Sequence, residues 1–207
     1  MPYISVEDRP VYTQSLSVVL ESVRQAKDPV QATEMIAWWC RYVLRRFSGQ
    51  AQEKEEVSFN EEQFSTELKR VLKHSGDVVA NQFRGKFREN DTLALLSVAG
   101  HINYCFSAVC WGFLGDSKGF DSGRYGTRSM LAENLRKVRD GITASTARKE
   151  TMFKGVLNDV LDEMYRRKTA VYEDVKIVEN GDVWTDGLLP VKKIEIDRGP
   201  PIVPVSG

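Results

Sequence analysis

The stretch that decides the fold is Thr92–Gly115, TLALLSVAGHINYCFSAVCWGFLG. It is long enough to cross a bilayer as a helix. However, His101 and Asn103 stand at its middle, where uncompensated polar groups are costly inside a membrane. No basic cluster flanks the stretch closely enough to set an orientation across a membrane. We therefore predict that it is the buried central helix of a soluble bundle.

Helical periodicity continues on both sides of this stretch, because apolar residues recur at spacings of three and four. We expect further helices at about 8–27, from Asp28-Pro29 to Ser48-Gly49, from Asn60 to Ser75-Gly76, from Asp77 to Phe83, at about 129–143 and at about 149–169. Asp28 is a predicted N-cap, with proline at the first helical position, and Asn90-Asp91 should cap the central helix. The fold is predicted to be all-α, a single-domain bundle of about six or seven helices.

The sequence after the last of these helices is less regular. Residues 172–184, YEDVKIVENGDVW, fit either a helix that Gly181 ends or a hairpin that turns at Asn180-Gly181. An acidic pair at the start slightly favours the helix, since carboxylates stabilise a helix N-terminus. Residues 185–207 alternate briefly and then become proline-rich. We divide the chain into a helical domain, 1–184, and a short extended tail, 185–207.

Composition argues against several classes of protein. The 29 basic and 29 acidic residues cancel, whereas a general nucleic-acid binder uses a basic surplus to displace counterions. Met1 is not followed by an apolar segment of the kind that directs secretion. Cys40, Cys105 and Cys110 have no CxxC or paired spacing, which is typical of reduced, buried thiols in a cytosolic protein. We expect a cytoplasmic protein that needs no cofactor and does not enter membranes.

Trp38 and Trp39 give an expectation about assembly. They are adjacent, so on a helix their side chains point about 100° apart. At least one of them should then lie at the edge of the core or in an interface. Exposed aromatic side chains of this kind favour a homo-oligomer.

Three segments carry a resemblance to a known family. They are the start MPYI with Glu7-Asp8-Arg9, the segment 100–104 (GHINY), and a run from Gly155-Val156-Leu157 through Tyr165-Arg166-Arg167 to 172–183 (YEDVKIVENGDV). Together they are similar to a family of small helical proteins of phages and bacteria. That family typically begins MPYI, contains a G-E-L-N-Y segment and ends in a YRR…PYE…KI…ENGDV tail.

The chain departs from this family pattern at several positions. His101 stands where the family has an acid, Val171 stands where it has proline, and Asn158 falls where an acidic residue is common. Residues 50–88 and the glycine-rich stretch 115–126 look like additions. The resemblance implies an α-helical accessory protein of phage origin, located in the cytoplasm of the host cell. It implies no catalytic residues.

The first candidate site is Tyr165-Arg166-Arg167, near the end of the last predicted helix. Two adjacent guanidinium groups can chelate a phosphate or a carboxylate, and Tyr172 can stack on a base or another ring. The alternative is structural. In that case the arginines pair with nearby carboxylates such as Glu163 and fix the exit of the chain from the helix.

The second candidate site is the group His101, Asn103 and Tyr104. These polar side chains stand in an apolar helix, and burying them without partners would cost a few kcal/mol each. They therefore either form an internal hydrogen-bond network or line a ligand pocket. His101 and Cys105 share a helix face, as the ligands of metal sites also do, but His74 is the one other histidine. We expect no metal site.

The glycine-rich stretch 115–126, GDSKGFDSGRYG, is a third candidate. It lacks the G-K-[ST] ending of a phosphate-binding loop. Its Arg124, together with aromatic neighbours, could close over an anionic ligand. The alternative is a plain flexible connection.

Acidic residues raise the alternative of an enzyme. All-α nucleotide pyrophosphohydrolases hold Mg²⁺ with carboxylates on facing helices. The residues that would serve here are Glu62, Asp159, Asp162 and Glu163. Their spacing does not match the E-E-x-x-E and E-x-x-D patterns of such sites, so solvated helix faces are the simpler interpretation. No arrangement of a nucleophile with a histidine base can be assigned.

The leading functional hypothesis is a phage-type accessory protein that acts by binding, without catalysis. Its partner would be an anionic, nucleotide-like small molecule or a host protein. The two alternatives are a Mg²⁺-dependent nucleotide pyrophosphohydrolase and a structural protein-interaction module.

Overall fold

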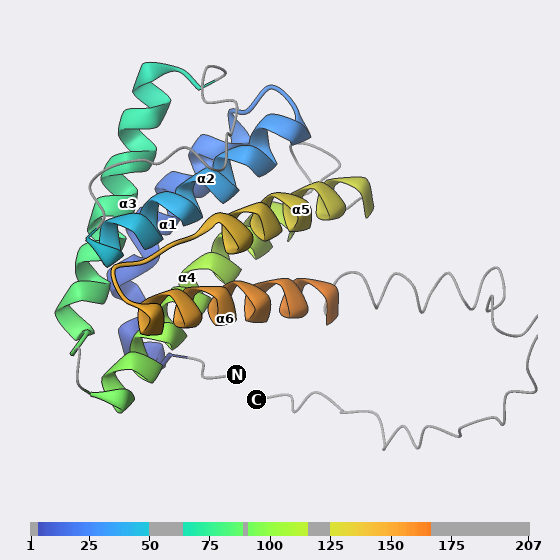
Figure 1. Cartoon of the computed structure of the whole chain (residues 1–207). Coiled ribbons are helices and arrows are strands. Elements are labelled where there is room, and N and C mark those ends of the chain that lie inside the picture. The colour runs from blue at the N-terminus through green and yellow to red at the C-terminus, as the bar shows by residue number, and fades with distance from the viewer. Residues whose placement is uncertain (1–3, 50–63, 89–90, 116–124, 167–207) are drawn as a thin grey trace, which may run out of the picture. The chain divides into compact units, whose positions relative to one another are not determined.

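The computed structural model of the chain describes residues 4–49, 64–88, 91–115 and 125–166 (Figure 1). In these ranges the chain forms six α-helices, one short 3-10 helix and no strand, which confirms the predicted all-α bundle. The elements are η1 (Val6–Asp8), α1 (Pro10–Arg24), α2 (Pro29–Ser48), α3 (Thr66–Lys86), α4 (Thr92–Gly115), α5 (Tyr125–Gly141) and α6 (Ala147–Met164). The predictions for 167–207, including the helix or hairpin at 172–184 and the domain boundary after it, lie outside the described residues.

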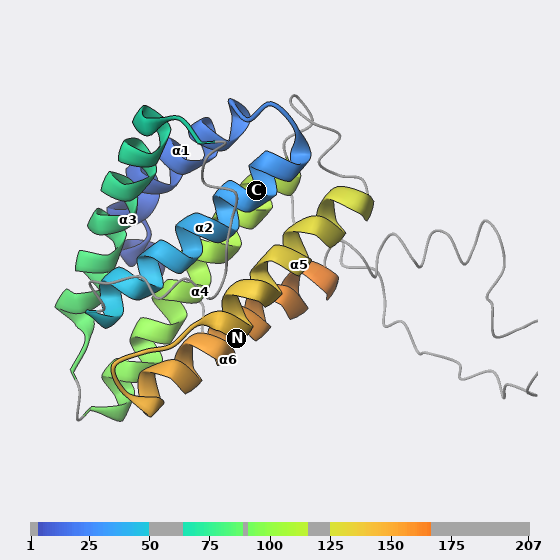
Figure 2. The same ribbon diagram turned by 45° about the horizontal axis from the view of Figure 1, so that its top comes forward.

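The apolar stretch Thr92–Gly115 forms one continuous helix, α4, which contacts α1, α2, α3 and α6. It passes behind α5 in Figure 1 and behind α2 in Figure 2. Tyr12 of α1 lies against His101 of α4, and further along both helices Leu20 lies against Gly112. Helices α1 and α4 therefore run side by side in the same direction.

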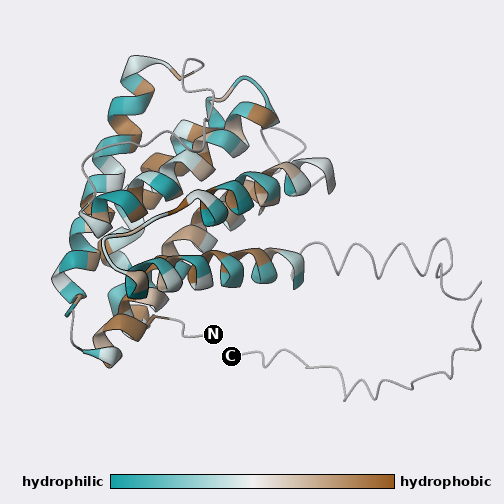
Figure 3. Ribbon diagram, viewed as in Figure 1, coloured by the Kyte–Doolittle hydropathy of each residue, from teal (hydrophilic) through white to brown (hydrophobic). Residues whose placement is uncertain are grey.

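Helix α4 is apolar on more than the side that faces the core. Its length and composition would suit a membrane span, and half of its most apolar 18-residue window is buried inside the bundle. Coloured by hydropathy, α5 and α6 alternate between polar and apolar residues, whereas much of α4 is apolar (Figure 3). The outward side of α4 thus lacks the charged residues that the other helices present to water.

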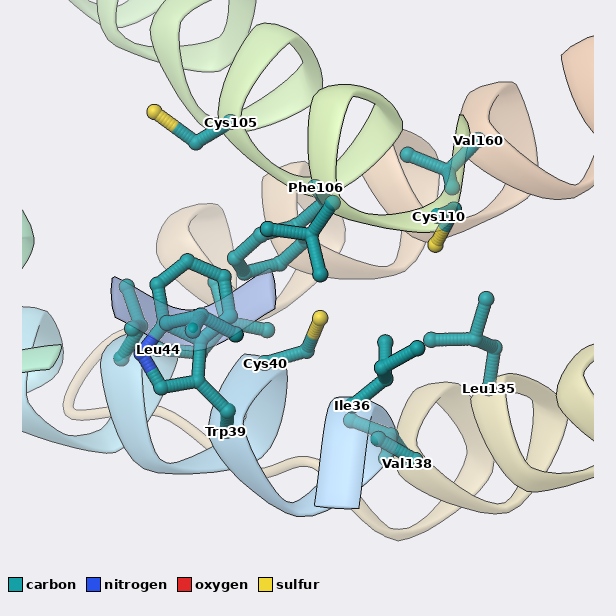
Figure 4. Close-up of a cluster of buried hydrophobic side chains, with 14 of the residues drawn as sticks. Ile36, Trp39, Cys40, Leu44, Cys105, Phe106, Cys110, Leu135, Val138 and Val160 are labelled. Atoms are coloured by element: carbon teal, nitrogen blue, oxygen red, sulfur yellow. The ribbon is translucent and has the colours of Figure 1, made fainter. Parts of the chain in front are cut away.

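The centre of the core is an aromatic contact between α2 and α4. The rings of Trp39 and Phe106 meet edge to face with their centroids 5.8 Å apart, and both residues are fully buried (Figure 4). Aromatic side chains bury more area than other residues and dominate the stability of a core. Cys40, Cys105 and Cys110 lie in the same cluster as free, buried thiols, as the sequence predicted.

The prediction that Trp38 or Trp39 reaches the edge of the core is wrong, because both are buried, at 3% and 0% exposure. Trp38 stacks on Tyr42 one turn further along α2, with ring centroids 5.5 Å apart. Phe64, which precedes α3, covers Trp38 edge-on. The two tryptophans serve this chain's own core, so they give no reason to expect a homo-oligomer.

Several helix ends follow from local sequence, as predicted. The Asp28 side chain accepts a hydrogen bond from the Gln31 amide at 2.8 Å, and Pro29 opens α2. Gly49 ends α2 with a φ of 82°, a left-handed conformation that glycine adopts without strain. Asp91 caps α4 by accepting from two backbone amides, at 2.8 and 3.1 Å.

The predicted break at Ser75-Gly76 is wrong, because α3 is continuous through it. A Cβ atom at Gly76 would lie 2.6 Å from Cδ1 of Tyr42. Glycine is therefore present for the close approach of α2 and α3 rather than for a turn. The side chain that caps α3 is Ser65, and the expected start at Asn60 lies outside the described residues.

Other helix boundaries differ from the predicted ones by a few residues. The first predicted helix is divided into η1 and α1, since Pro10 opens α1 and its last residue is Arg24. Helix α5 begins at Tyr125 rather than near residue 129. Helix α6 begins two residues early, at Ala147, because Thr146 caps it.

Candidate functional site

The predicted site residues that the structure describes lie in two separate places. His101, Asn103 and Tyr104 occupy the middle of α4, whereas Tyr165 and Arg166 directly follow the last residue of α6. Arg124, Arg167 and Tyr172 lie outside the described residues.

His101 is held by a network that joins η1, α1 and α4. The Tyr12 hydroxyl lies 3.2 Å from Nδ1 of His101, and Asp8 Oδ2 lies 3.9 Å from Nε2. Both rings are buried, with Tyr12 0% and His101 2% exposed. Of the two readings that the sequence left open, this geometry is that of an internal network.

Burial also controls the protonation of this network. It lowers the pKa of His101, and the positive charge of Lys86 lowers that pKa further, although Asp8 opposes the change. Burial raises the pKa of Tyr12. At neutral pH a neutral imidazole can accept a hydrogen bond from the Tyr12 hydroxyl at Nδ1, which leaves its own proton on Nε2, facing Asp8.

Asp8 links this network to the end of α3. Its Oδ1 accepts a hydrogen bond from Lys86 Nζ at 2.8 Å, and this contact lowers the pKa of the Asp8 carboxyl group. The carboxylate thus carries the ion pair with Lys86 on one oxygen and faces His101 with the other. This arrangement holds η1 against the bundle.

Arg9 is the polar residue of this region that is not fully satisfied. Its guanidinium group lies over the Tyr104 ring, 5.6 Å from the centroid. Its Nε is buried and has no hydrogen-bond partner among the described residues. The contact with the ring offsets part of the loss of solvation, but an acceptor for this N–H is missing.

Asn103 and Arg166 have partners within the chain. Asn103 Oδ1 accepts a hydrogen bond from the Ser107 hydroxyl one turn further along α4. Arg166 donates to Glu163 Oε2, as the structural alternative predicted, and that carboxylate is buried at 4% exposure. Tyr165 is 55% exposed. At the end of α6 the structure thus brings an arginine to a carboxylate of its own helix.

The described carboxylates among those proposed for a Mg²⁺ site, Asp159, Asp162 and Glu163, do not form a metal-binding group. The described residues contain no group of three or more His, Cys, Asp or Glu side chains that could hold a metal ion. Asp159 and Asp162 are neighbours on α6, and burial together with the charge of Asp162 raises the pKa of Asp159. Glu62 lies outside the described residues. No observation here favours metal-dependent hydrolysis.

A surface feature that we did not predict from the sequence lies beside Arg9, on the outward sides of α1 and α4. Residues 10–20 of α1 and all of α4 contain no Asp, Glu, Lys or Arg. We name their outward residues the neutral face: exposed Thr13, Gln14 and Ser17 on α1, and half-buried Tyr104, Ser107, Ala108 and Trp111 on α4.

Contacts between the two helices make the neutral face continuous. Thr13 and Ser17 share the side of α1 that carries Leu20, at spacings of seven and three residues, and Leu20 lies against Gly112 of α4. The chain's charged fraction of 28% would give about ten charges in a stretch of this length. The missing charges were visible in the sequence, but which residues point outward was not.

Comparison with known proteins adds a family of unknown role. Residues 125–183 match the model of a family described as a domain of unknown function (DUF6899). No curated protein and no solved structure matches the chain significantly. The match begins with α5 and α6, which are joined by a hydrogen bond from Arg139 to Asn158 at 2.9 Å. It also covers the C-terminal run on which the resemblance rests, whereas segment 100–104 lies outside it.

Proposed function

We propose that this chain is a non-catalytic accessory protein that acts by binding another protein chain through the neutral face. The observation that carries the proposal is the absence of charge on the outward side of α4 and of residues 10–20 of α1, beyond which the exposed pair Glu21 and Arg24 follows on α1. Surfaces at the centre of protein interfaces are depleted of charged residues and enriched in Tyr, Trp and Arg. The neutral face has Tyr104 and Trp111, with Arg9 at its edge.

The intramolecular contacts of the predicted ligand-binding residues support a protein partner over a small molecule. His101, Asn103 and Arg166 each have a partner within the chain. The buried His101 and Asn103 therefore need no ligand to offset their burial, and the exposed Arg166 is already paired with Glu163. The family that the sequence resembles supports an accessory role in a phage, in the cytoplasm of its host. This origin is part of the proposal.

Site-specific photo-crosslinking tests the proposal. A benzoylphenylalanine placed at Ser17 should give a discrete adduct of higher mass when the protein is irradiated in the cells that produce it. The matched control is the same residue at Ser129, which is exposed on α5, away from the neutral face. An adduct from both positions, or from neither, would contradict the proposal.

A second candidate function has one observation in its favour. Arg9 offers a buried Nε–H with no acceptor, and Lys86 lies close by through Asp8. An anionic ligand, with a phosphate or carboxylate group, would supply that acceptor. Since the Arg9 guanidinium already lies over the Tyr104 ring, this site suits the anionic group of a ligand better than a stacked base.

A thermal-shift titration tests this second candidate. Inorganic phosphate and mono-, di- and cyclic nucleotides are compared, with and without Mg²⁺. A ligand at one hundred times its Kd should stabilise the fold by about 2.7 kcal/mol. The shift should disappear in Arg9→Gln and persist in Arg84→Gln, an exposed arginine of α3 that bonds Asn81. The absence of a shift with every compound removes this candidate.

A further inference from the structure

We infer that the partner of the neutral face is a second copy of this chain, so that the protein is a dimer whose α1 and α4 pack across a two-fold axis. This inference rests on the proposed function, because it names the partner of the same surface. It replaces the tryptophan argument for self-association, since Trp38 and Trp39 are buried within one chain.

The absence of charge on the neutral face favours a second copy as the partner. In a two-fold interface each residue near the axis meets its own copy, so every charge there faces a like charge. A surface that binds a different protein normally uses charge complementarity to select its partner. The neutral face has no charge with which to make that selection. A surface without charge therefore avoids like-charge contacts across a two-fold axis, and it lacks the charge pattern that would select a different protein.

The outward stripe of α4 also suits a contact between helices. Its positions follow the alternating spacing of four and three that characterises helix-to-helix seams: Leu93, Ser97, Tyr104, Ser107 and Trp111 are exposed or half-buried, and Gly100 between them is buried. Large and small residues are mixed along this line. That mixture lets the side chains of two helices interdigitate, because a large residue of one helix needs space on the other.

Exposure at the end of the stripe agrees with this interpretation. Leu93 is 77% exposed and Leu96 is 56% exposed, although leucine is usually buried. They lie on the first two turns of α4, where no other described helix covers them. A second copy seated along α4 would remove this apolar surface from water, with a gain of free energy that scales with the area covered.

The net charge of the whole chain is also compatible with self-association. A net charge of zero means that two copies do not repel one another at long range. Arg9 adds a specific requirement, since its Nε–H lacks an acceptor among the residues that the structure describes. Hydroxyl and amide oxygens are acceptors that the neutral face itself provides, on Ser17 and Gln14.

Light scattering coupled to size-exclusion chromatography tests the inference on the full chain. The chain has a mass of 23.5 kDa, and the measured mass should be twice that value at micromolar concentration. Ser17→Glu and Ala108→Glu each place two carboxylates near the axis, one from each copy. Each should weaken dimerisation at least tenfold. The matched control, Ser129→Glu, adds the same charge on α5 and should leave the mass unchanged.

The outcomes separate this inference from the proposed function. Circular dichroism establishes that each variant is folded. If Ala108→Glu does not fold, Ser17→Glu, at an exposed helical position, still tests the effect of an added charge on dimerisation. A monomer at all concentrations overturns the inference, as does a dimer that all three variants leave intact. If the Ser17 crosslink then joins the chain to a different protein, the proposed function stands without it. Binding of the monomer to neutral lipid vesicles through this face would overturn both.

Discussion

Helices α2 and α4 are the two most buried helices of the bundle, and their outward sides differ in composition. Helix α2 places polar groups there and satisfies them within the chain. The Tyr42 hydroxyl donates to Asp77 of α3 at 3.0 Å, and Arg46 donates to the same carboxylate oxygen at 2.6 Å. Helix α4 places no charged side chain on its outward side, where Tyr104 and Trp111 are half-buried.

The difference concerns the outward side of each helix, since the core-facing sides of both are buried. On the outward side of α2, Tyr42 and Arg46 share a partner within the chain, although Oε2 of Glu34 on the same helix is buried with no hydrogen-bond partner among the described residues. The outward side of α4 combines apolar residues with exposure, which costs free energy until something covers it. Four predictions test how far the two helices differ, from the largest expected effect to the smallest.

Trp39→Ala should have the largest effect, because it removes the contact of α2 with Phe106 of α4. Truncation of a buried aromatic residue costs about 3–5 kcal/mol of unfolding free energy, since transfer and cavity terms add. Chemical denaturation measures the loss. Trp38→Ala is the comparison within α2. A loss below 1 kcal/mol for Trp39→Ala would show that this contact is not the centre of the core.

Gly76→Ala and Gly112→Ala form a matched pair for the two helices. The new Cβ at position 76 would lie 2.6 Å from Cδ1 of the Tyr42 ring. The new Cβ at position 112 would lie 2.6 Å from Cδ1 of Leu20. A ring packed between helices has little room to move, whereas Leu20 can rotate. We expect Gly76→Ala to cost roughly 1–2 kcal/mol after its gain in helix propensity. Gly112→Ala should be nearly neutral. Equal losses in the two thermal denaturation curves would contradict this difference.

Asp77→Ala tests the polar side of α2. It leaves the Tyr42 hydroxyl and Arg46 without their shared acceptor. Because both groups are partly exposed and water can replace the carboxylate, we expect a loss of about 1 kcal/mol. The burial of Tyr42 and its bond to Asp77 raise its pKa to about 12, so an alkaline titration of tyrosine absorbance should show that pKa falling in the variant.

The smallest effect is one of pH, and it concerns α4. Burial lowers the pKa of His101 from its ordinary value of 6.5, so the unfolded chain takes up this proton at a higher pH than the folded chain does. Protonation therefore favours unfolding, and stability should fall as the pH is lowered from 7.5 to 5.5. Asp8 stays ionised in that window, because Lys86 lowers its pKa further from 3.8.

His101→Gln provides the control for the pH effect. It keeps a hydrogen-bonding side chain opposite Tyr12 but removes the titrating group. The variant should lose part of the pH dependence of the unfolding free energy between pH 7.5 and 5.5. An unchanged slope would mean that His101 takes up its proton equally well in the folded and unfolded chain.

Sequence predicted those features of the fold that depend on neighbours along the chain. Asp28, Pro29 and Gly49 set the ends of α2 through contacts within four residues. The failure at Gly76 has the opposite origin, because its reason, the ring of Tyr42, lies 34 positions away in sequence. A glycine in a turn and a glycine at a close approach of two helices look the same in one sequence.

The candidate site shows the same limit. Sequence reasoning identified that His101 needs partners, but Tyr12 is 89 residues away and reaches it only through the packing of α1 on α4. Arg166 and Glu163 were paired correctly as one alternative, since they are three residues apart on one helix. The neutral face requires knowledge of which side of each helix points outward, and the relative placement of α1 and α4 supplies that knowledge.

The three buried thiols of α2 and α4 allow the opening of the core to be followed chemically. Cys40, Cys105 and Cys110 are buried, and burial raises the pKa of each, to about 12 for Cys110. A thiol reagent can therefore modify them only when the core opens around them. The rate of labelling measures how often the core opens, without any added probe or substitution.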